Sequence, residues 1–296
     1  MKTYRTDIYE QITNQIIEAL EYCSAWQRPW HTPEMVNVIP TNAKTGQQYR
    51  GINVLALWAK AQNRGYLNGL WATFQQWKEL GATVKKGEKS CAVVFWGTIE
   101  KDNREKAGAK ESSDSAEAET VLFARTYHVF NVSQVDGYEE TKAEPLTDER
   151  IQHAESFFSG LGIVVHQASK AFYDSLQDSI HMPPFANFLS REGYYATLAH
   201  EVTHWTGHES RLNRDLKNRF GSEAYAMEEL VAELGAAFIC AELEIASNPR
   251  EDHAAYIQSW LKVLKADKRA VFTAASKAQQ AADWMKGLTT TIKIAA

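Results

Sequence analysis

The sequence has few cysteines and no long hydrophobic run. Three cysteines stand far apart at Cys23, Cys91 and Cys240, and none belongs to a C-x-x-C pair. This pattern argues against a disulfide framework and indicates a reducing compartment. Residues 1–15 lack the apolar stretch of a signal peptide, and no run approaches the roughly 18 apolar residues of a membrane-spanning helix. We therefore expect a cytoplasmic protein without a membrane partner.

Charge is divided unevenly along the 296 residues, which are enough for a large core and two domains. With 44% hydrophobic and 23% charged residues, the chain is typical of a globular protein. The net charge is −5, but residues 1–98 carry +4, from 11 basic and 7 acidic residues, which leaves −9 for the rest. That basic third also contains six of the nine tryptophans: Trp26, Trp30, Trp58, Trp71, Trp77 and Trp96. The asymmetry predicts two functions on two domains.

Residues 1–136 are expected to form an α+β domain. Apolar spacing predicts helices over residues 6–22, 52–65 and 73–81, with a polar, turn-rich loop over residues 41–51. Segments 90–98 and 121–132 are rich in Val, Phe and Tyr, and they predict strands. Between these strands, Lys101–Thr120 contains no Val, Ile, Leu or aromatic residue, which predicts a disordered insertion.

Residues 151–296 are expected to form a mostly helical second domain with a small sheet, joined by a linker over residues 137–150. The pattern predicts a helix over residues 148–161 and short strands around residues 163–168 and 170–174. Pro183 and Pro184 exclude a helix from residues 178–188, which we expect to be extended. Four predicted helices follow, over about residues 190–206, 222–245, 250–266 and 269–286.

The stretch HEVTH, from His200 to His204, is typical of a zinc site. Positions i and i+4 lie on one face of a helix, so both imidazoles can aim a nitrogen at a point about 2 Å away. Glu201 lies one step round the helix, where it can take a proton from a metal-bound water as that water attacks a carbonyl. A chance match on a surface helix is the alternative. Ser190 is a plausible N-cap and supports the helix.

The downstream helix over residues 222–245 offers a third ligand. Glu229 and Glu233 are four residues apart and share one face, although such a pair alone is usually solvated surface. H-E-x-x-H followed by E-x-x-x-E resembles gluzincin-type zinc peptidases. By that resemblance Glu229 is the third ligand, Glu233 orients a ligand histidine, and the metal is Zn²⁺ or another divalent ion such as Mn²⁺.

Two neighbouring residues compete for the role of third ligand. Glu228 points about 100° away from Glu229 on the helix and is expected to be solvated. His208 follows Gly207, but the metzincin pattern H-E-x-x-H-x-x-G-x-x-H places its third histidine where this chain has Ser210. We expect His208 to pack or hydrogen-bond near the helix end.

The first domain combines cations with aromatic rings, as binding of single-stranded nucleic acid requires. These residues lie in or beside glycine-containing loops, and the candidates for DNA contact are Lys44, Tyr49, Arg50, Trp71, Trp77, Lys85, Lys86 and Lys89. Burial of the tryptophans in the core is the alternative for the rings. A solvated turn is the alternative for the lysines.

Four segments resemble the N-terminal domain of ArdC-type antirestriction proteins: WQRPW, TGQQYRGINVLAL, GATVKKGEKSCAVVFW and YHVFNVSQVDG. That domain itself resembles part of plasmid-encoded primases. YYATLAHEVTHWTGHESRLNR and YAMEELVAELGAAF resemble the zincin-like metallopeptidase domain that follows it in that family. The resemblance implies a conjugative-plasmid protein that binds incoming single-stranded DNA and protects it from host restriction.

Two mechanisms stay open at this point. In one, the zinc centre is an active peptidase directed at a protein such as a restriction-system subunit, with residues 178–188 as the edge on which a substrate strand adds. In the other, the protein is a non-catalytic single-stranded DNA shield, or a primase accessory factor, and the metal site is structural or dormant. The presence of Glu201 favours the first.

Overall fold

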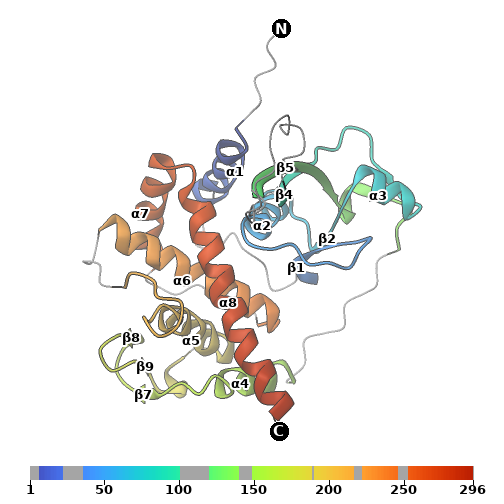
Figure 1. Ribbon diagram of the computed structural model, residues 1–296. Helices are drawn as coiled ribbons and strands as arrows, with labels where there is room; N and C mark the ends of the chain where they lie inside the picture. The colour runs from blue at the N-terminus through green and yellow to red at the C-terminus, as the bar shows by residue number, and fades with distance from the viewer. Residues whose placement is uncertain are drawn as a thin grey trace, which may run out of the picture.

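The structure is a computed structural model that describes residues 7–22, 36–100, 120–139, 149–188, 190–216, 222–245 and 253–295. It is a mixed α+β fold, with a sheet-containing N-terminal part beside a mostly helical C-terminal part (Figure 1). This class agrees with the sequence prediction. Most of the predicted insertion, residues 101–119, and most of the predicted linker, residues 140–148, lie outside the described residues.

The N-terminal part is built on a four-stranded sheet in the order β1-β2-β5-β4. Its β1–β2 pair is parallel and the other pairs are antiparallel, with a long β4–β5 register from Cys91↔Val129 to Glu100↔Thr120. The elements are α1 (Ile8–Tyr22), β1 (Val36–Asn42), α2 (Ile52–Arg64), β2 (Asn68–Thr73), α3 (Phe74–Glu79), β3 (Thr83–Val84), β4 (Cys91–Glu100), β5 (Thr120–Asn131), η2 (Val132–Gln134) and β6 (Val135–Asp136).

Local signals explain where the N-terminal helices begin and end. The predicted helix ending at Gly65 is confirmed, because Gly65 caps α2 with a left-handed φ of 67°. Thr73 caps α3, since its hydroxyl accepts from the Gln76 backbone in a capping box. The sequence did not predict β1 or β2. Pro40 weakens the strand signal of β1, and the structure places it in an edge strand, where a missing N–H is tolerated.

The C-terminal part begins with a small sheet and continues as helices. Its elements are α4 (Glu149–Ser159), β7 (Val165–Gln167), β8 (Phe172–Asp174), β9 (Ser179–Met182), η3 (Phe185–Asn187), α5 (Arg191–Thr206), α6 (Glu223–Glu242), α7 (His253–Ala266) and α8 (Ala270–Ala295). Helix α8, red in Figure 1, packs mainly against α6 and also against α5 and α2. None of the described helices is long and apolar enough to cross a membrane.

The segment predicted as a substrate-binding edge is not at an edge. Within residues 178–188, only β9 is a strand, and it lies in the middle of the order β7-β9-β8. Both sides of β9 are therefore already hydrogen-bonded, to β7 in parallel and to β8 in antiparallel. After Pro183 and Pro184 the chain turns through η3. The prediction that this segment adds a substrate strand is wrong, because a central strand has no free backbone groups.

One hydrophobic core joins the two parts of the chain. Helix α1 packs against both α2 and α7, and α8 packs against α2 as well as α6. Trp58 of α2 lies 5.9 Å from Phe238 of α6 between ring centroids. The two predicted domains thus share buried side chains, and the boundary between them stays a prediction.

Candidate metal centre

Helices α5 and α6 lie against each other and carry the predicted metal ligands. Ser190 caps α5 by accepting from the Gly193 backbone at 3.0 Å, and Ser222 caps α6 by accepting from Tyr225 at 3.1 Å. Gly235 of α6 permits the close approach, because a Cβ at this position would lie 2.5 Å from Cγ2 of Thr203 on α5. Larger side chains here would separate the two helices.

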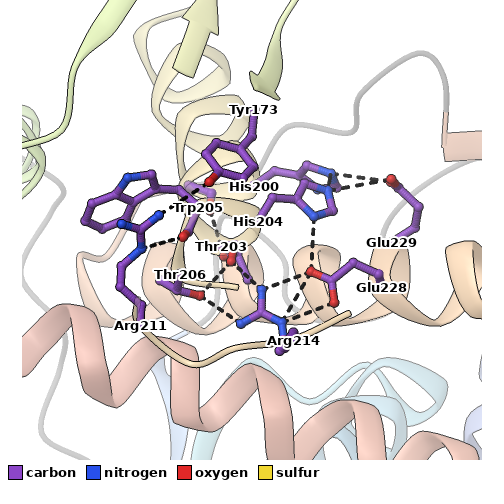
Figure 2. A network of polar contacts seen from close by, with 11 residues as sticks. Tyr173, His200, Thr203, His204, Trp205, Thr206, Arg211, Arg214, Glu228 and Glu229 are labelled. Carbon is purple, nitrogen blue, oxygen red and sulfur yellow. Dashed lines mark hydrogen bonds and ion pairs between the residues drawn. The ribbon is translucent and has the colours of Figure 1, made fainter. Parts of the chain in front are cut away.

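The structure brings His200, His204 and Glu229 together, with one ligand atom from each within 4.8 Å of the others. His200 Nε2 lies 3.2 Å from His204 Nε2. The Glu229 carboxylate lies 3.5 Å from His200 Nε2 and 3.6 Å from His204 Nε2. Ligands about 2.0–2.1 Å from a tetrahedral metal stand about 3.3–3.4 Å apart. The three side chains, which meet at the right of Figure 2, therefore fit a single divalent ion.

The far side of each imidazole faces a carboxylate. His204 Nδ1 lies 3.2 Å from Glu228 Oε1, and His200 Nδ1 lies 3.4 Å from Glu233 Oε2. An ionised carboxylate only accepts, so each of these contacts favours a neutral imidazole that carries its proton on Nδ1 and its lone pair on Nε2. The two Nε2 lone pairs and the Glu229 carboxylate then face one another as three acceptors. A cation bound among them removes the repulsion, so the tautomers also fit a metal.

Glu229 is held in its ionised form. In the metal-free chain, where the imidazoles can be protonated, burial would raise the pKa of Glu229, but a hydrogen bond from protonated His200, the charges of protonated His204 and His200, and a bond from Tyr225 lower that pKa to about 2. A carboxylate must be ionised to bind a metal. The surroundings of Glu229 therefore suit the role of a ligand.

Glu228 is buried, contrary to the expectation that it is solvated. It is 9% exposed and lies between His204 and Arg214, whose guanidinium contacts the Glu228 carboxylate at 2.9–3.3 Å (Figure 2). Burial would raise the pKa of Glu228, but hydrogen bonds to His204 and Arg214 lower it. The prediction that Glu228 is solvated failed because its partner, Arg214, lies in the segment after α5, and no spacing in the sequence indicates this contact.

Arg214 ties that segment to the end of α5. It donates to the Thr203 carbonyl at 2.6 Å and to the Thr206 hydroxyl at 2.9 Å. Gly207 leaves room for it, because a Cβ there would lie 2.9 Å from Arg214 Nη2. The glycine that suggested a metzincin comparison therefore has a packing role.

Glu201 and His208 take different places relative to the ligands. Glu201 follows His200 on α5 and is 4% exposed. His208 lies beyond the helix end, where its Nδ1 contacts the Ser210 hydroxyl at 2.8 Å. It is outside the cluster of ligand atoms, which agrees with the expectation that it hydrogen-bonds near the helix end.

The two tryptophans predicted to stack on DNA are core residues. Trp71 and Trp77 are both 0% exposed, and Trp77 Nε1 donates to the Phe130 carbonyl at 2.9 Å. A ring without an accessible face cannot stack on a base, so the prediction is wrong for both. Trp26 and Trp30 lie outside the described residues.

The predicted cations are at the surface, several of them paired with acids. Lys44 pairs with Glu79, and Arg50 pairs with Asp283. Lys85 lies 3.8 Å from Asp136, whereas Lys86 and Lys89 are exposed. Tyr49 is half-buried beside Asn42, whose amide donates to the Tyr49 hydroxyl. Their contact with DNA stays a prediction.

Comparison with known proteins agrees with both parts of the chain. Residues 6–130 match the family described as the N-terminal domain of anti-restriction factor ArdC, and residues 152–277 match the zincin-like metallopeptidase family. The metal-free crystal structure of the antirestriction protein ArdC from plasmid R388 has a TM-score of 0.77 and 39% identity, covering 96% of this chain and 98% of that one. The chain belongs to the ArdC family of antirestriction proteins. The Mn(II)-bound structure of the R388 protein is similar too, with a TM-score of 0.76 and 40% identity.

Three other relatives match nearly the whole of this chain but differ in how much of their own length it covers. The uncharacterized protein y4eC of Sinorhizobium fredii is 48% identical over 95% of this chain and 92% of its own length. Two Escherichia coli proteins named DNA primase TraC are 36% and 37% identical over 96% and 94% of this chain. This chain spans only 27% and 20% of those primases.

Proposed function

We propose that this ArdC-family chain is an antirestriction protein that binds incoming single-stranded DNA of a conjugative plasmid and uses a metal-dependent, peptidase-like centre. The observation that carries the metal part is the convergence of three ligand atoms within 4.8 Å, from His200, His204 and Glu229. Membership of the ArdC family supports the antirestriction part.

His200, His204 and Glu229 would hold a divalent ion, Zn²⁺ by the ligand types or Mn²⁺ as named for the R388 protein. When bound, such an ion supplies a Lewis acid that polarises a carbonyl and acidifies a water. Glu201, the residue after His200, would accept the proton from the attacking water. Glu233 and Glu228 would keep the two imidazoles oriented through Nδ1. The substrate class is a protein, such as a subunit of a restriction system.

DNA binding is proposed for the basic N-terminal part. Lys85, Lys86 and Lys89 lie in an exposed turn, where their ammonium groups would contact phosphates. Arg50 is exposed as well, with 64% of its side chain accessible.

The test uses the full-length protein and its Glu201→Gln variant. Metal content is measured by elemental analysis, and cleavage of casein and of the protein itself is followed with and without single-stranded DNA. We expect about one divalent ion per chain in both proteins, and proteolysis in the wild type only. Cleavage that persists at an equal rate in Glu201→Gln would remove Glu201 from the chemistry. A protein that takes up no divalent ion would end the metal proposal.

The TraC primases favour a second candidate function. In those proteins a region similar to this whole chain is joined to much more polypeptide. In this candidate the chain is a non-catalytic DNA shield or primase accessory factor, and its metal is structural. It predicts that Glu201→Gln retains full protection of DNA against restriction, whereas variants of the metal ligands lose stability.

A further inference from the structure

A groove of about 800 Å³ lies between α1, β4 and α8, where the two parts of the chain meet. Three aromatic rings line it: Tyr9, Trp96 and Phe272. The Tyr9 centroid lies 4.6 Å from that of Phe272 and 6.1 Å from that of Trp96, so the rings form one cluster. Trp96 is 39% exposed, which is unusual for tryptophan, a residue that is mostly buried on average.

The groove also carries an excess of positive charge. Arg50, Arg269 and Lys277 line it, against a single lining carboxylate, Asp283. Asp283 pairs with Arg50. Arg269 lies 5.1 Å over the Tyr9 ring. Among the described residues, no carboxylate lies within ion-pair distance of Arg269 or Lys277.

Helix α8 and the residue before it present this mixture on one face. Arg269, Phe272 and Lys277 follow the i, i+3 and i+8 positions of a helix, and Thr273, Ser276 and Gln280 fill the same lining stripe. The opposite face of α8 is buried in the core through Val271, Ala274, Ala275, Ala278, Ala281, Ala282 and Met285. If this face of α8 only contacted solvent, there would be no need for Phe272 beside its cations or for the exposed Trp96 of β4 next to them.

We propose that this groove is the track for single-stranded DNA, with Trp96, Phe272 and Tyr9 stacking on bases and Arg50, Arg269 and Lys277 contacting phosphates. Exposed rings interleaved with cations are the general requirement for binding single strands. The proposal rests on the proposed DNA binding. It replaces the buried Trp71 and Trp77 as stacking residues, and it makes DNA contact a property of both parts of the chain.

The same hairpin provides a matched control. Phe95 is 54% exposed and adjacent to Trp96 in β4, so its side chain points to the opposite face of the strand. Arg125 pairs with Phe95 in the register of β4 and β5, and it is also exposed. Phe95 and Arg125 therefore offer the same chemistry, an exposed ring and a cation, outside the groove.

The experiment measures binding of the full chain to a fluorescein-labelled oligothymidine of about 20 nucleotides, which is longer than a typical single-strand site. Trp96→Ala and Phe272→Ala should each weaken binding at least about fivefold, the lower limit for loss of a stacked base. Lys277→Ala should lower the slope of log affinity against log salt by about 0.7, the value for one phosphate contact on a single strand. Asp283→Asn should tighten binding at least about twofold at low salt, because it removes the one lining carboxylate.

Controls separate a local effect from a change in folding. Phe95→Ala and Arg125→Ala should leave affinity unchanged, and circular dichroism should show the same melting temperature for each groove variant. Trp96→Phe keeps a stacking ring and should retain most of the affinity, while the quenching of tryptophan fluorescence by DNA should fall.

Other results would each contradict a defined part of the proposal. If the wild type and the groove variants bind the oligothymidine equally well, the groove is not the binding site and the DNA binds elsewhere on the chain. If only Phe95→Ala and Arg125→Ala lose affinity, the DNA binds on the other face of the hairpin. If the wild type does not bind, the proposed DNA-binding function fails together with the groove. Tighter binding of the corresponding RNA would overturn single-stranded DNA as the occupant.

Discussion

The metal centre and the proposed DNA groove are built in opposite ways. At the proposed metal centre, each candidate ligand histidine faces a second buried carboxylate, and Glu228 is itself held by Arg214. In the groove, the side chains are partly or fully exposed, and their contacts are mostly ring to ring or cation to ring. A small ion needs ligands held to a fraction of an ångström, whereas a flexible strand needs rings and charges that remain accessible.

This difference determines what a substitution does in each region. A change at the metal centre leaves a buried charge or lone pair without its partner, so it should have a large effect on metal binding and a measurable effect on stability. A change in the groove removes one contact among several and should weaken DNA binding without unfolding the protein.

The largest expected effect comes from His204→Ala. This variant should lose tight binding of the divalent ion, because one of three protein ligands is removed. Affinity for single-stranded DNA should remain within about twofold of the wild type, since the groove shares no residue with the ligand cluster. Elemental analysis and fluorescence anisotropy on the same preparation check both parts. A parallel loss of DNA binding would show that the two regions are coupled.

Glu228→Gln tests whether the partner of a ligand histidine matters. The amide keeps the shape but loses the negative charge toward His204 and Arg214, so metal affinity should fall about 10–100-fold. Competition with a chromophoric chelator measures it. Glu223→Gln, an exposed position at the start of the same helix, is the control and should keep wild-type affinity. Equal metal affinities for the two variants would show that Glu228 only forms an ion pair with Arg214 and does not affect metal binding.

Gly235→Ala tests the close approach of α5 and α6. Its Cβ would lie 2.5 Å from Cγ2 of Thr203 in a buried contact, so we expect a loss of about 1–3 kcal/mol in the free energy of unfolding. Gly287→Ala is the matched control, because nothing lies within 4 Å of its Cβ and the helix should gain a little stability. Chemical denaturation measures both. An unchanged Gly235→Ala protein would mean that the helices can separate without cost.

The smallest expected effect concerns Asp178, which pairs with Arg211 beside α5. The hydrogen bond from Arg211 lowers the pKa of Asp178 below 3.8 despite partial burial. A folded pKa below the unfolded one contributes stability above the unfolded pKa, and this contribution is lost as the pH falls through the folded pKa. Asp178→Asn tolerates the positive φ of 50° and should cost less than about 1 kcal/mol at pH 7. At a pH below both pKa values, chemical denaturation should give the same free energy of unfolding for wild type and variant. A difference that persists at that pH would show that the charge of Asp178 is not what stabilises the fold.

The sequence indicated which candidate metal ligands lie together better than it indicated which aromatic rings are exposed, for a physical reason. The spacing of His200 and His204 is local, and a helix converts it directly into geometry. Ser190 and Ser222 cap the two helices, and the packing of α6 against α5 brings Glu229 to the histidines. By contrast, Glu228 depends on Arg214, 14 residues away in the chain, and only the folded chain shows that contact.

Aromatic residues gave no comparable local signal. Trp71, Trp77 and Trp96 all lie in the basic third of the sequence, yet the first two are fully buried and only Trp96 is exposed. The groove brings together Tyr9, Trp96 and Phe272 from three distant elements. Which tryptophan remains accessible is decided by how α2 and α3 pack against the sheet, and no pattern in the sequence reports that packing.

We expect one divalent ion to bind between α5 and α6, held by His200, His204 and Glu229. Anomalous diffraction from a crystal of the zinc-loaded protein, recorded at the zinc edge, tests it most directly. We expect one strong peak within about 2–2.5 Å of Nε2 of both histidines and of a Glu229 oxygen. A peak bound instead by Glu228 or His208, or no peak near α5, would show that these three residues do not form the metal site.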